Sequence, residues 1–296
     1  MPRTIRRVVI ALAAAAASAY AAGAVIVWHT PDRFINFPEP EIPQTPGMLG
    51  IRYDEVWLRV GSHRELIHGW WVPNGKDAPV FLLLPGTGRT KAGLVHVGAA
   101  MHAAGAAVLM IDYRGLGRSD RGPLTEAEMY EDAEAAWLEL RWHQPDAGRR
   151  FVYGHSLGAA PALELAARYP DVNGVVIEGA PTSVRELLRG TWVDALYPID
   201  WMLALRFDQA AKLRRLTVPL LVIHGKRDDI VPPAMGIQLY LRATGRKSLL
   251  LVDGAAHSDA AVVGAAEYRE AVERLLPSVK RALAALTRRA VPNRAG

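Results

Sequence analysis

A single serine lies between two glycines at the point where an apolar run ends. The stretch FVYGHSLGAAP, residues 151–161, places Ser156 in the pattern G-x-S-x-G, directly before an alanine-rich run that favours a helix. A sharp turn from a buried strand into a helix exposes such a hydroxyl, and small residues on each side permit the close backbone contact. The helix N-terminus also directs free N–H groups at any oxyanion that forms there. This context predicts that Ser156 is a nucleophile, whereas the pattern alone also suits a serine that only caps a helix.

A serine hydroxyl needs a base to take its proton and an acid to orient that base. Histidine suits the role of base because it titrates near neutral pH. Of the nine histidines, His257 in VDGAAHSD directly follows the last apolar run, and it is the predicted base. His29 lies near the N-terminus, and His63 and His68 belong to the early pair of strands. His96, His102 and His143 lie in or beside predicted helices. His155 lies in the serine turn, and His224 lies at a strand end, where packing explains it.

Three carboxylates follow predicted strands and are candidates to orient His257. Asp228 and Asp229 lie in HGKRDDIVP, and only one of them can face the histidine because neighbouring side chains in a loop diverge. Asp229 would otherwise cap the helix that follows. Glu178 ends the run GVVIE and is a further alternative. The chain order serine, aspartate, histidine is the one expected on a sheet of this kind.

An acyl transition state also needs hydrogen-bond donors for its oxyanion. The first predicted donor is the backbone N–H of Leu157, directly after the nucleophile. The second is expected from residues 85–88, Pro-Gly-Thr-Gly, which follow the apolar run PVFLLL and turn towards the site. In that loop the backbone N–H of Thr87 is the predicted donor.

Six apolar runs after residue 78 alternate with stretches of helical composition. The runs are PVFLLLPG, AAVLMIDYRG, RRFVYGHS, GVVIEGAP, PLLVIHGKRD and SLLLVDGAAH, each too apolar to expose a face, as expected of buried parallel strands. The helical stretches are residues 92–104, 125–143, 157–169, 234–244 and 260–286. Two earlier segments, GIRYDEVWLRVG and ELIHGWWVP, alternate apolar and polar residues and predict an antiparallel pair. Together these patterns predict an α/β fold with a doubly wound, mostly parallel sheet of about eight strands.

Residues 8–28 form an uncharged stretch near the N-terminus. Its length suffices to cross the hydrocarbon core of a membrane, which takes about 20 residues. Arginines precede it, whereas Asp32 and Arg33 cancel after it, so the positive-inside rule predicts an extracytoplasmic catalytic domain held by a signal-anchor helix. Secretion after signal cleavage is the alternative, since small residues at 17–21 resemble cleavage sites. The apolar run continues past these sites, which favours the anchor.

The remaining segments define the expected domain organisation. We expect the signal-anchor at residues 1–30, a proline-rich tether at 31–49 and the catalytic domain at 50–290. The interval 182–218 is long for a connection between strands and carries several aromatic residues, which predicts a small helical cap. These aromatics could line an acyl-chain pocket or face a bilayer, while burial against the sheet explains them equally well.

The composition limits the classes of function. The chain of 296 residues has no cysteine, which excludes disulfides, thiol nucleophiles and cysteine-ligated zinc. Its formal net charge of +5 is concentrated at the two ends, and no basic stripe interleaved with aromatics runs through the middle. We therefore expect no nucleic-acid partner.

The assembled motifs resemble the α/β-hydrolase superfamily over residues 52–286. The segments DYRGLGRSDRGPLTEAEMYEDAEAAWLEL, GHSLG, HGKRDDIVP and GAAHSD are similar in combination to the membrane-anchored serine hydrolases labelled BEM46-like, ABHD13-like or ABHD17-like. The resemblance favours Asp228 over Asp229 as the acid, and it implies a structural role for Arg114 and its turn. The first loop of the superfamily commonly reads His-Gly, whereas this chain has Pro85 before the glycine. This departure bears on the prediction of Thr87 as an oxyanion donor and does not affect the predicted triad.

The resemblance implies a serine hydrolase that acts on acyl esters or thioesters through an acyl-enzyme intermediate, without a metal or cofactor. Ser156 would attack, His257 would move the proton and Asp228 would orient His257. An apolar cap and a nearby membrane suit a small-molecule or lipid-like acyl substrate. Peptidase or amidase activity with the same triad is the alternative reaction, and a catalytically silent, membrane-tethered interaction module is the alternative outside enzymes.

Overall fold

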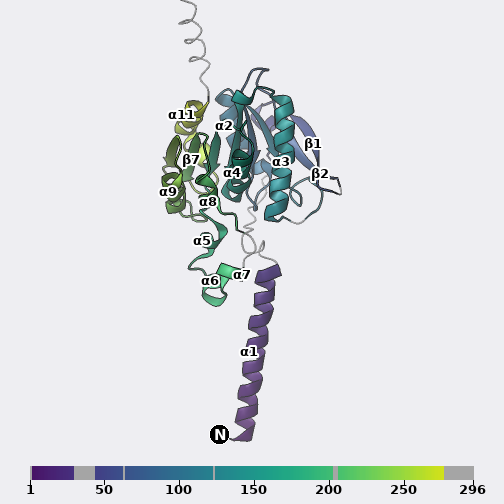
Figure 1. The fold of residues 1–296 in the computed structure, drawn as a ribbon, viewed down its shortest axis with the longest axis vertical. Helices are drawn as coiled ribbons and strands as arrows, with labels where there is room; N and C mark the ends of the chain where they lie inside the picture. Colours follow the sequence, from purple (N-terminus) through teal and green to yellow (C-terminus); the bar gives the residue numbers. More distant parts are fainter. Residues whose placement is uncertain (1, 30–43, 63, 123, 203–205, 277–296) are drawn as a thin grey trace, which may run out of the picture.

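The chain folds around one central sheet. In the computed structural model the described residues are 2–29, 44–62, 64–122, 124–202 and 206–276. They form an eight-stranded sheet in the order β1-β2-β4-β3-β5-β6-β7-β8, with helices on both faces (Figure 1). The strands β3 to β8 are parallel, while β1 pairs with β2 and β2 with β4 in antiparallel fashion. The predicted α/β class and the mostly parallel sheet of eight strands are confirmed. Most of the predicted tether and the predicted residues 277–290 of the catalytic domain lie outside the described residues.

The strands are Asp54–Val60 (β1), Glu65–Val72 (β2), Val80–Leu84 (β3), Ala107–Ile111 (β4), Arg150–His155 (β5), Val175–Glu178 (β6), Leu220–Gly225 (β7) and Lys247–Val252 (β8). Every residue of β3, β4, β5, β6 and β7 is buried, as their unbroken apolar runs predict for strands covered on both faces. The prediction is wrong for β8, where most residues are partly exposed. This strand pairs only with β7 and forms the edge of the sheet.

Two groups of helices cover the two faces. The helices are Val95–Ala103 (α2), Glu126–His143 (α3), Ala159–Arg168 (α4), Pro233–Arg242 (α9), Ala260–Val263 (α10) and Ala265–Leu275 (α11). Along β3, Leu82 and Leu84 pack in the core that contains α3 and α4, whereas Phe81 and Leu83 pack in the core that contains α2 and α11. This alternation is the period of two that a strand imposes. The last predicted helix is wrong in one respect, because it breaks at Gly264 into α10 and α11.

Four short helices fill the interval between β6 and β7, as predicted for the cap. They are Val184–Leu188 (α5), Trp192–Leu196 (α6), Ile199–Met202 (α7) and Gln209–Leu213 (α8). The first three project from the body of the molecule beside α1 (Figure 1). The fourth returns to the body and packs against α4.

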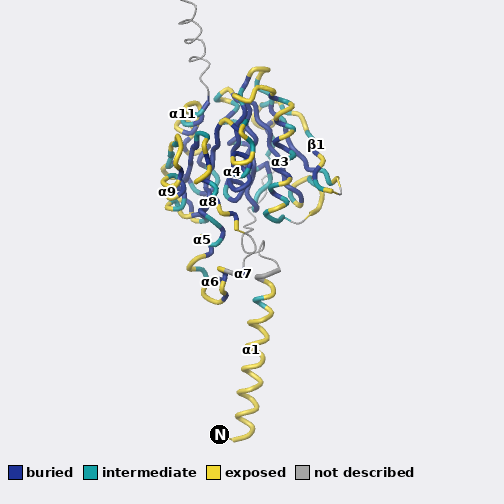
Figure 2. Tube along the Cα trace, viewed as in Figure 1, coloured by how far each residue is buried: buried dark blue, intermediate teal, exposed yellow. Residues whose placement is uncertain are grey.

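The N-terminal helix, Arg3–His29 (α1), stands away from the sheet with most of its length exposed (Figure 2). Its segment Arg3–Ile26, of 24 residues, contains an 18-residue window with mean hydropathy 2.0 and is long and apolar enough to cross a membrane. A signal sequence has the same length and composition, so the segment fits a membrane anchor and a signal sequence alike.

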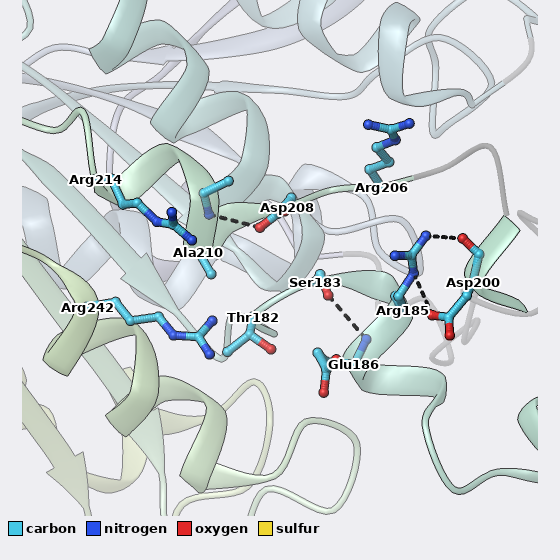
Figure 3. A pocket seen from close by; sticks show the side chains of 11 residues that line it. Thr182, Ser183, Arg185, Glu186, Asp200, Arg206, Asp208, Ala210, Arg214 and Arg242 are labelled. Carbon is cyan, nitrogen blue, oxygen red and sulfur yellow. Dashed lines mark hydrogen bonds and ion pairs between the residues drawn. The ribbon is translucent and has the colours of Figure 1, made fainter.

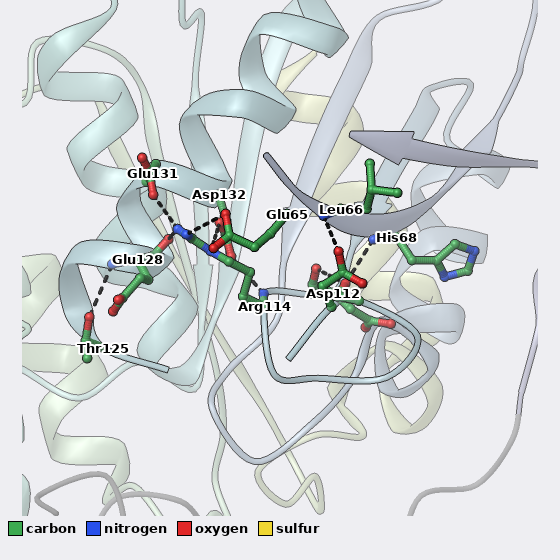
Figure 4. A network of polar contacts seen from close by, with 11 residues as sticks. Glu65, Leu66, His68, Asp112, Arg114, Thr125, Glu128, Glu131 and Asp132 are labelled. Atoms are coloured by element: carbon green, nitrogen blue, oxygen red, sulfur yellow. Dashed lines mark hydrogen bonds and ion pairs between the residues drawn. The ribbon is translucent and has the colours of Figure 1, made fainter. Parts of the chain in front are cut away.

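The turn after β4 is held by a polar network rather than left open for a ligand (Figure 4). The Arg114 N–H donates to Asp132 Oδ2 at 2.8 Å, and the Arg114 guanidinium lies 2.8 Å from Asp132 Oδ1. Ser119 donates its hydroxyl to the carbonyl of Asp112 at 2.8 Å and accepts the His68 N–H at 2.9 Å. These bonds connect β2, β4 and α3, which supports the structural role expected for this turn.

Candidate active site

Ser156 occupies the turn between β5 and α4. The strand ends at His155, residues Ser156–Gly158 form one 3-10 turn (η5), and α4 begins at the next residue. The φ angle of Ser156 is +52°, a left-handed conformation that costs a non-glycine residue about 1–3 kcal/mol. A nucleophilic serine on a sharp strand-to-helix turn is strained in this way, and Ser156 remains partly exposed.

The glycines on either side of the serine leave no room for a side chain. A Cβ on Gly154 would overlap the carbonyl oxygen of Gly158, and a Cβ on Gly158 would overlap the carbonyl oxygens of Leu84 and Pro85. The turn is therefore pressed against the end of β3. The structure supplies the close backbone contact that the sequence pattern predicts.

The loop after β3 lies directly against the serine. A Cβ on Gly86 would lie 3.0 Å from Ser156 Cβ and 3.6 Å from Ser156 Oγ, so the loop backbone faces the hydroxyl at close range. Thr87 follows and is buried. The far end of the loop is fixed because the Lys91 N–H donates to Asp112 Oδ1 at 2.6 Å and the Lys91 ammonium forms an ion pair with the same carboxylate. The segment that carries Thr87 is thus held beside Ser156.

His257 and Asp228 form a buried pair at the same edge of the sheet. His257 Nδ1 lies 2.7 Å from Asp228 Oδ2. The other oxygen, Asp228 Oδ1, accepts the N–H groups of Ile230 at 3.0 Å and Val231 at 2.8 Å. Burial of Asp228 opposes its ionisation, but hydrogen bonds from His224, from His257 and from the Val231 N–H outweigh burial, and the pKa of Asp228 falls below its ordinary value.

His155, which precedes the serine, connects the loop of His257 to the serine turn. Its Nε2–H donates to the carbonyl oxygen of His257 at 3.0 Å, and the two rings meet edge to face with centroids 4.8 Å apart. Burial, with a smaller contribution from the charge of His257, lowers the pKa of His155 to about 3. His155 is therefore a neutral donor that ties the loop of His257 to the residue before Ser156.

The two alternative acids make other contacts. Asp229 is exposed, and α9 is preceded by Pro232 without a side-chain cap, so the expected capping role of Asp229 is wrong. Glu178 Oε2 accepts the hydroxyls of Tyr153 at 2.9 Å and Tyr268 at 2.7 Å. Burial raises the pKa of Glu178, and the two tyrosine hydrogen bonds only partly oppose it. The geometry favours Asp228, since it is the carboxylate that bonds to the imidazole.

His224 belongs to the site, although its position at a strand end predicts a packing role. Its Nε2 lies 3.0 Å from Asp228 Oδ2 and 2.9 Å from the carbonyl oxygen of Val231, so Nε2 carries the proton and is shared between two acceptors. Both side chains are fully buried. The carboxylate of Asp228 therefore receives two imidazole donors and two backbone donors. The spacing H-x-x-x-D across the turn after β7 is the signal that would have indicated this contact.

The chemistry available here is that of a hydroxyl, an imidazole and a carboxylate. Because Asp228 engages His257 Nδ1, the other ring nitrogen is the one that can receive a proton from Ser156. Within the described ranges, no group of three or more His, Asp and Glu side chains is arranged to hold a metal ion. The arrangement suits nucleophilic attack by Ser156 on an acyl carbon.

Comparisons with known sequences identify related proteins. A family model described as serine aminopeptidase, S33, matches residues 75–211. The uncharacterized protein Rv2307c of Mycobacterium tuberculosis is 30% identical over 259 residues, which cover 85% of this chain and 89% of that protein. The human alpha/beta hydrolase domain-containing protein 17B is 31% identical over 172 residues, which cover 57% of this chain and 56% of the human protein.

Solved structures share the fold. The esterase Pf2001 of Pyrococcus furiosus superposes with a TM-score of 0.66 at 23% identity and covers 83% of this chain and 99% of its own. The esterase domain of a Rhodothermus marinus protein superposes with a TM-score of 0.54 at 24% identity and covers 75% of this chain and 98% of its own. The sheet, the serine turn and the sequence relatives together show that this chain belongs to the α/β-hydrolase superfamily.

Proposed function

We propose that the protein is a serine hydrolase that cleaves acyl esters with Ser156, His257 and Asp228. The observation that carries this proposal is the buried His257–Asp228 pair, at 2.7 Å, whose loop is hydrogen-bonded to His155, the residue before a serine in a strained strand-to-helix turn. A serine that only caps a helix needs neither the positive φ nor a buried imidazole–carboxylate pair at the same edge.

In the first half-reaction, Ser156 Oγ attacks the carbonyl carbon of the ester while His257 Nε2 takes the hydroxyl proton. The carbonyl oxygen becomes an oxyanion, and the backbone N–H groups of Leu157 and Thr87 donate to it. The imidazolium is stabilised by the ionised Asp228. The intermediate then expels the alcohol oxygen, which receives the proton from His257, and the acyl group stays on Ser156.

In the second half-reaction, water attacks the acyl carbon and transfers a proton to His257. The new tetrahedral intermediate uses the same oxyanion donors, and its collapse releases the carboxylic acid as the proton returns to Ser156 Oγ. The chain's own residues supply every proton transfer in this sequence.

The proposal is tested by reaction with a fluorophosphonate, which modifies serines that a neighbouring base activates. We expect the full-length protein to be labelled at a single peptide that contains Ser156, as read by mass spectrometry. Labelling at any other serine, or none at all, would favour a catalytically silent interaction module.

Peptide or amide hydrolysis is the second candidate reaction, because the matching family model is described as a serine aminopeptidase. We favour esters because the exposed residues of α6, Trp192, Ala195 and Leu196, are apolar, and this helix lies beside the apolar helix α1. A matched pair of substrates that differ only in an ester or an amide bond decides between the two, by comparison of kcat/KM.

We further propose that α1 is retained as a membrane anchor with the catalytic domain outside the cytoplasm. Three arginines precede its uncharged stretch: Arg3, Arg6 and Arg7. A positive flank of this kind remains on the cytoplasmic side. Mass measurement of the protein purified from membranes distinguishes the retained anchor from a cleaved signal peptide.

His224 is expected to act as a positioning residue for Asp228. Replacing it by leucine removes a charge-assisted hydrogen bond worth about 1.5–3 kcal/mol, which corresponds to roughly a 10- to 100-fold fall in kcat. Replacing it by glutamine keeps a donor near the Nε2 position and is expected to restore most of the rate. KM should change little in both variants, whereas the melting temperature should fall in His224→Leu and recover in His224→Gln, because the buried Asp228 carboxylate loses and then regains a hydrogen-bond donor. An equal loss of rate in His224→Leu and His224→Gln would show that the shape of the side chain, and not its hydrogen bond to Asp228, matters at this position.

A further inference from the structure

The end of the cap is apolar although it is exposed. This cap tip, residues 192–198, comprises α6 and the two residues after it. Its exposed residues are Trp192, Ala195, Leu196 and Pro198. Trp192 and Leu196 are 62% and 55% exposed and lie four positions apart, so they share one face of α6. Exposed tryptophan and leucine side by side indicate a surface that another apolar phase covers.

The charges around the cap tip are satisfied within the cap. Asp194, the acid of α6, accepts the Gly190 N–H at 2.9 Å and is only partly exposed. At the base of the cap, Arg185 lies 3.1 Å from Asp200 (Figure 3). The same figure shows further arginines, Arg214 and Arg242, around the cavity beneath the cap. The cap is thus apolar at its tip and charged at its base.

The cap tip packs on α1 inside the segment that is apolar enough to cross a membrane. Tyr197 stacks on Tyr20 with ring centroids 5.2 Å apart and planes at 24°, and it covers Gly23 so closely that a Cβ there would overlap its hydroxyl. Both α1 residues lie within Arg3–Ile26. With a rise of about 1.5 Å per residue, Gly23 lies about 7.5 Å and Tyr20 about 12 Å from the end of the uncharged stretch at residue 28.

We propose that the cap tip inserts into the lipid leaflet on the side of the catalytic domain. The inference rests on the proposed anchoring role of α1, because a segment that touches Tyr20 and Gly23 lies at the depth of the lipid once α1 spans the bilayer. Interfacial helices bury their apolar face by about 5–10 Å, a range that includes the depth of Gly23. Tryptophan and tyrosine are the residues that collect at this boundary. Insertion would let the cap receive an acyl substrate directly from the membrane.

The test uses single nitroxide labels on the full-length protein in vesicles of phosphatidylcholine. The chain has no cysteine, so one introduced cysteine carries the only label. Three exposed leucines form a matched set: Leu196→Cys in the cap tip, Leu12→Cys in α1 and Leu241→Cys in α9, with 55%, 66% and 66% exposure in the wild-type chain. The accessibility of each label to oxygen, which concentrates in lipid, is compared with its accessibility to a water-soluble nickel chelate.

The expected result is that labels at positions 12 and 196 collide several-fold more with oxygen than with the nickel chelate, while position 241 shows the reverse. A lipid signal at 12 with an aqueous signal at 196 overturns the insertion and leaves the anchor intact. Low accessibility to both reagents at 196 also overturns it, because a protein surface, such as a second copy of the chain, then covers the tip. An aqueous signal at 12 overturns the anchor and the insertion together.

Discussion

Replacing Ser156 by alanine is expected to abolish ester hydrolysis and fluorophosphonate labelling while the fold is retained. The hydroxyl is the attacking atom, and loss of a nucleophilic serine in a triad lowers kcat by about 10⁴- to 10⁶-fold. Ser156→Ala also removes no packing from the core, since the side chain is partly exposed above the turn. The measurement is turnover of a p-nitrophenyl ester, with a thermal melt to confirm folding.

Ser248→Ala is the matched control for this variant, because Ser248 is exposed on the edge strand β8. We expect its turnover and labelling to equal those of the wild type. Persistent labelling of Ser156→Ala would refute the assignment of the nucleophile. If Ser156→Ala loses both ester turnover and labelling while Ser248→Ala keeps them, the silent interaction module is left without support.

The second large effect is expected from Asp228→Asn, with a fall in kcat of about 10⁴-fold. Asparagine has nearly the same volume, and its oxygen can still accept the N–H groups of Ile230 and Val231 at 3.0 and 2.8 Å. Its amide nitrogen then faces His257 and His224, which both donate to the carboxylate in the wild type. A donor opposite a donor forces the imidazole into the wrong tautomer or orientation.

The same substitution also affects stability through the pKa of Asp228, which lies below its ordinary value in the folded protein. A lowered folded pKa means that the ionised carboxylate stabilises the fold above its unfolded pKa, and that this contribution is lost as the pH falls. Asp228→Asn lacks the contribution at every pH. Its melting temperature should therefore lie below that of the wild type at neutral pH and approach it in acid.

Asp229→Asn and Glu178→Gln are the comparison variants for the acid. Asp229 is exposed, so its replacement is expected to leave kcat within about twofold of the wild type, in line with small effects at surface sites. Glu178 bonds to two buried tyrosines, so its replacement should affect stability more than turnover. A larger loss of kcat at either position than at Asp228 would overturn the choice of acid.

Several features were predictable from the sequence because they depend on neighbours in the chain. The turn around Ser156 is one, since Gly154 and Gly158 are required wherever a strand bends sharply into a helix. The buried strands are another, because an unbroken apolar run has no polar face to expose. The partial exposure of β8 was not predictable in this way. Its apolar run is like those of the buried strands, and only the order of strands in the sheet decides which strand lies outermost.

Other features depend on how distant segments meet, and only the tertiary structure decides them. The choice between Asp228 and Asp229 follows from the turn after β7, in which backbone N–H groups fix the direction of one carboxylate. The roles of His224 and His155 follow from contacts with that carboxylate and with the loop of His257. No local pattern distinguishes the role of His155 from packing, and the H-x-x-x-D spacing of His224 and Asp228 indicates a contact only because the turn after β7 brings the two side chains together.

The sequence by itself determined the class of fold, the sharp turn around Ser156 and the presence of an apolar N-terminal helix, because each depends on a local hydrophobic period or a local steric requirement. The tertiary structure decided which acid faces His257, which histidines support it, and that Tyr197 of the cap lies on Tyr20 and Gly23 of α1. These are contacts between segments far apart in the chain. Their geometry depends on the packing of the whole sheet and its helices, which no short stretch of sequence specifies.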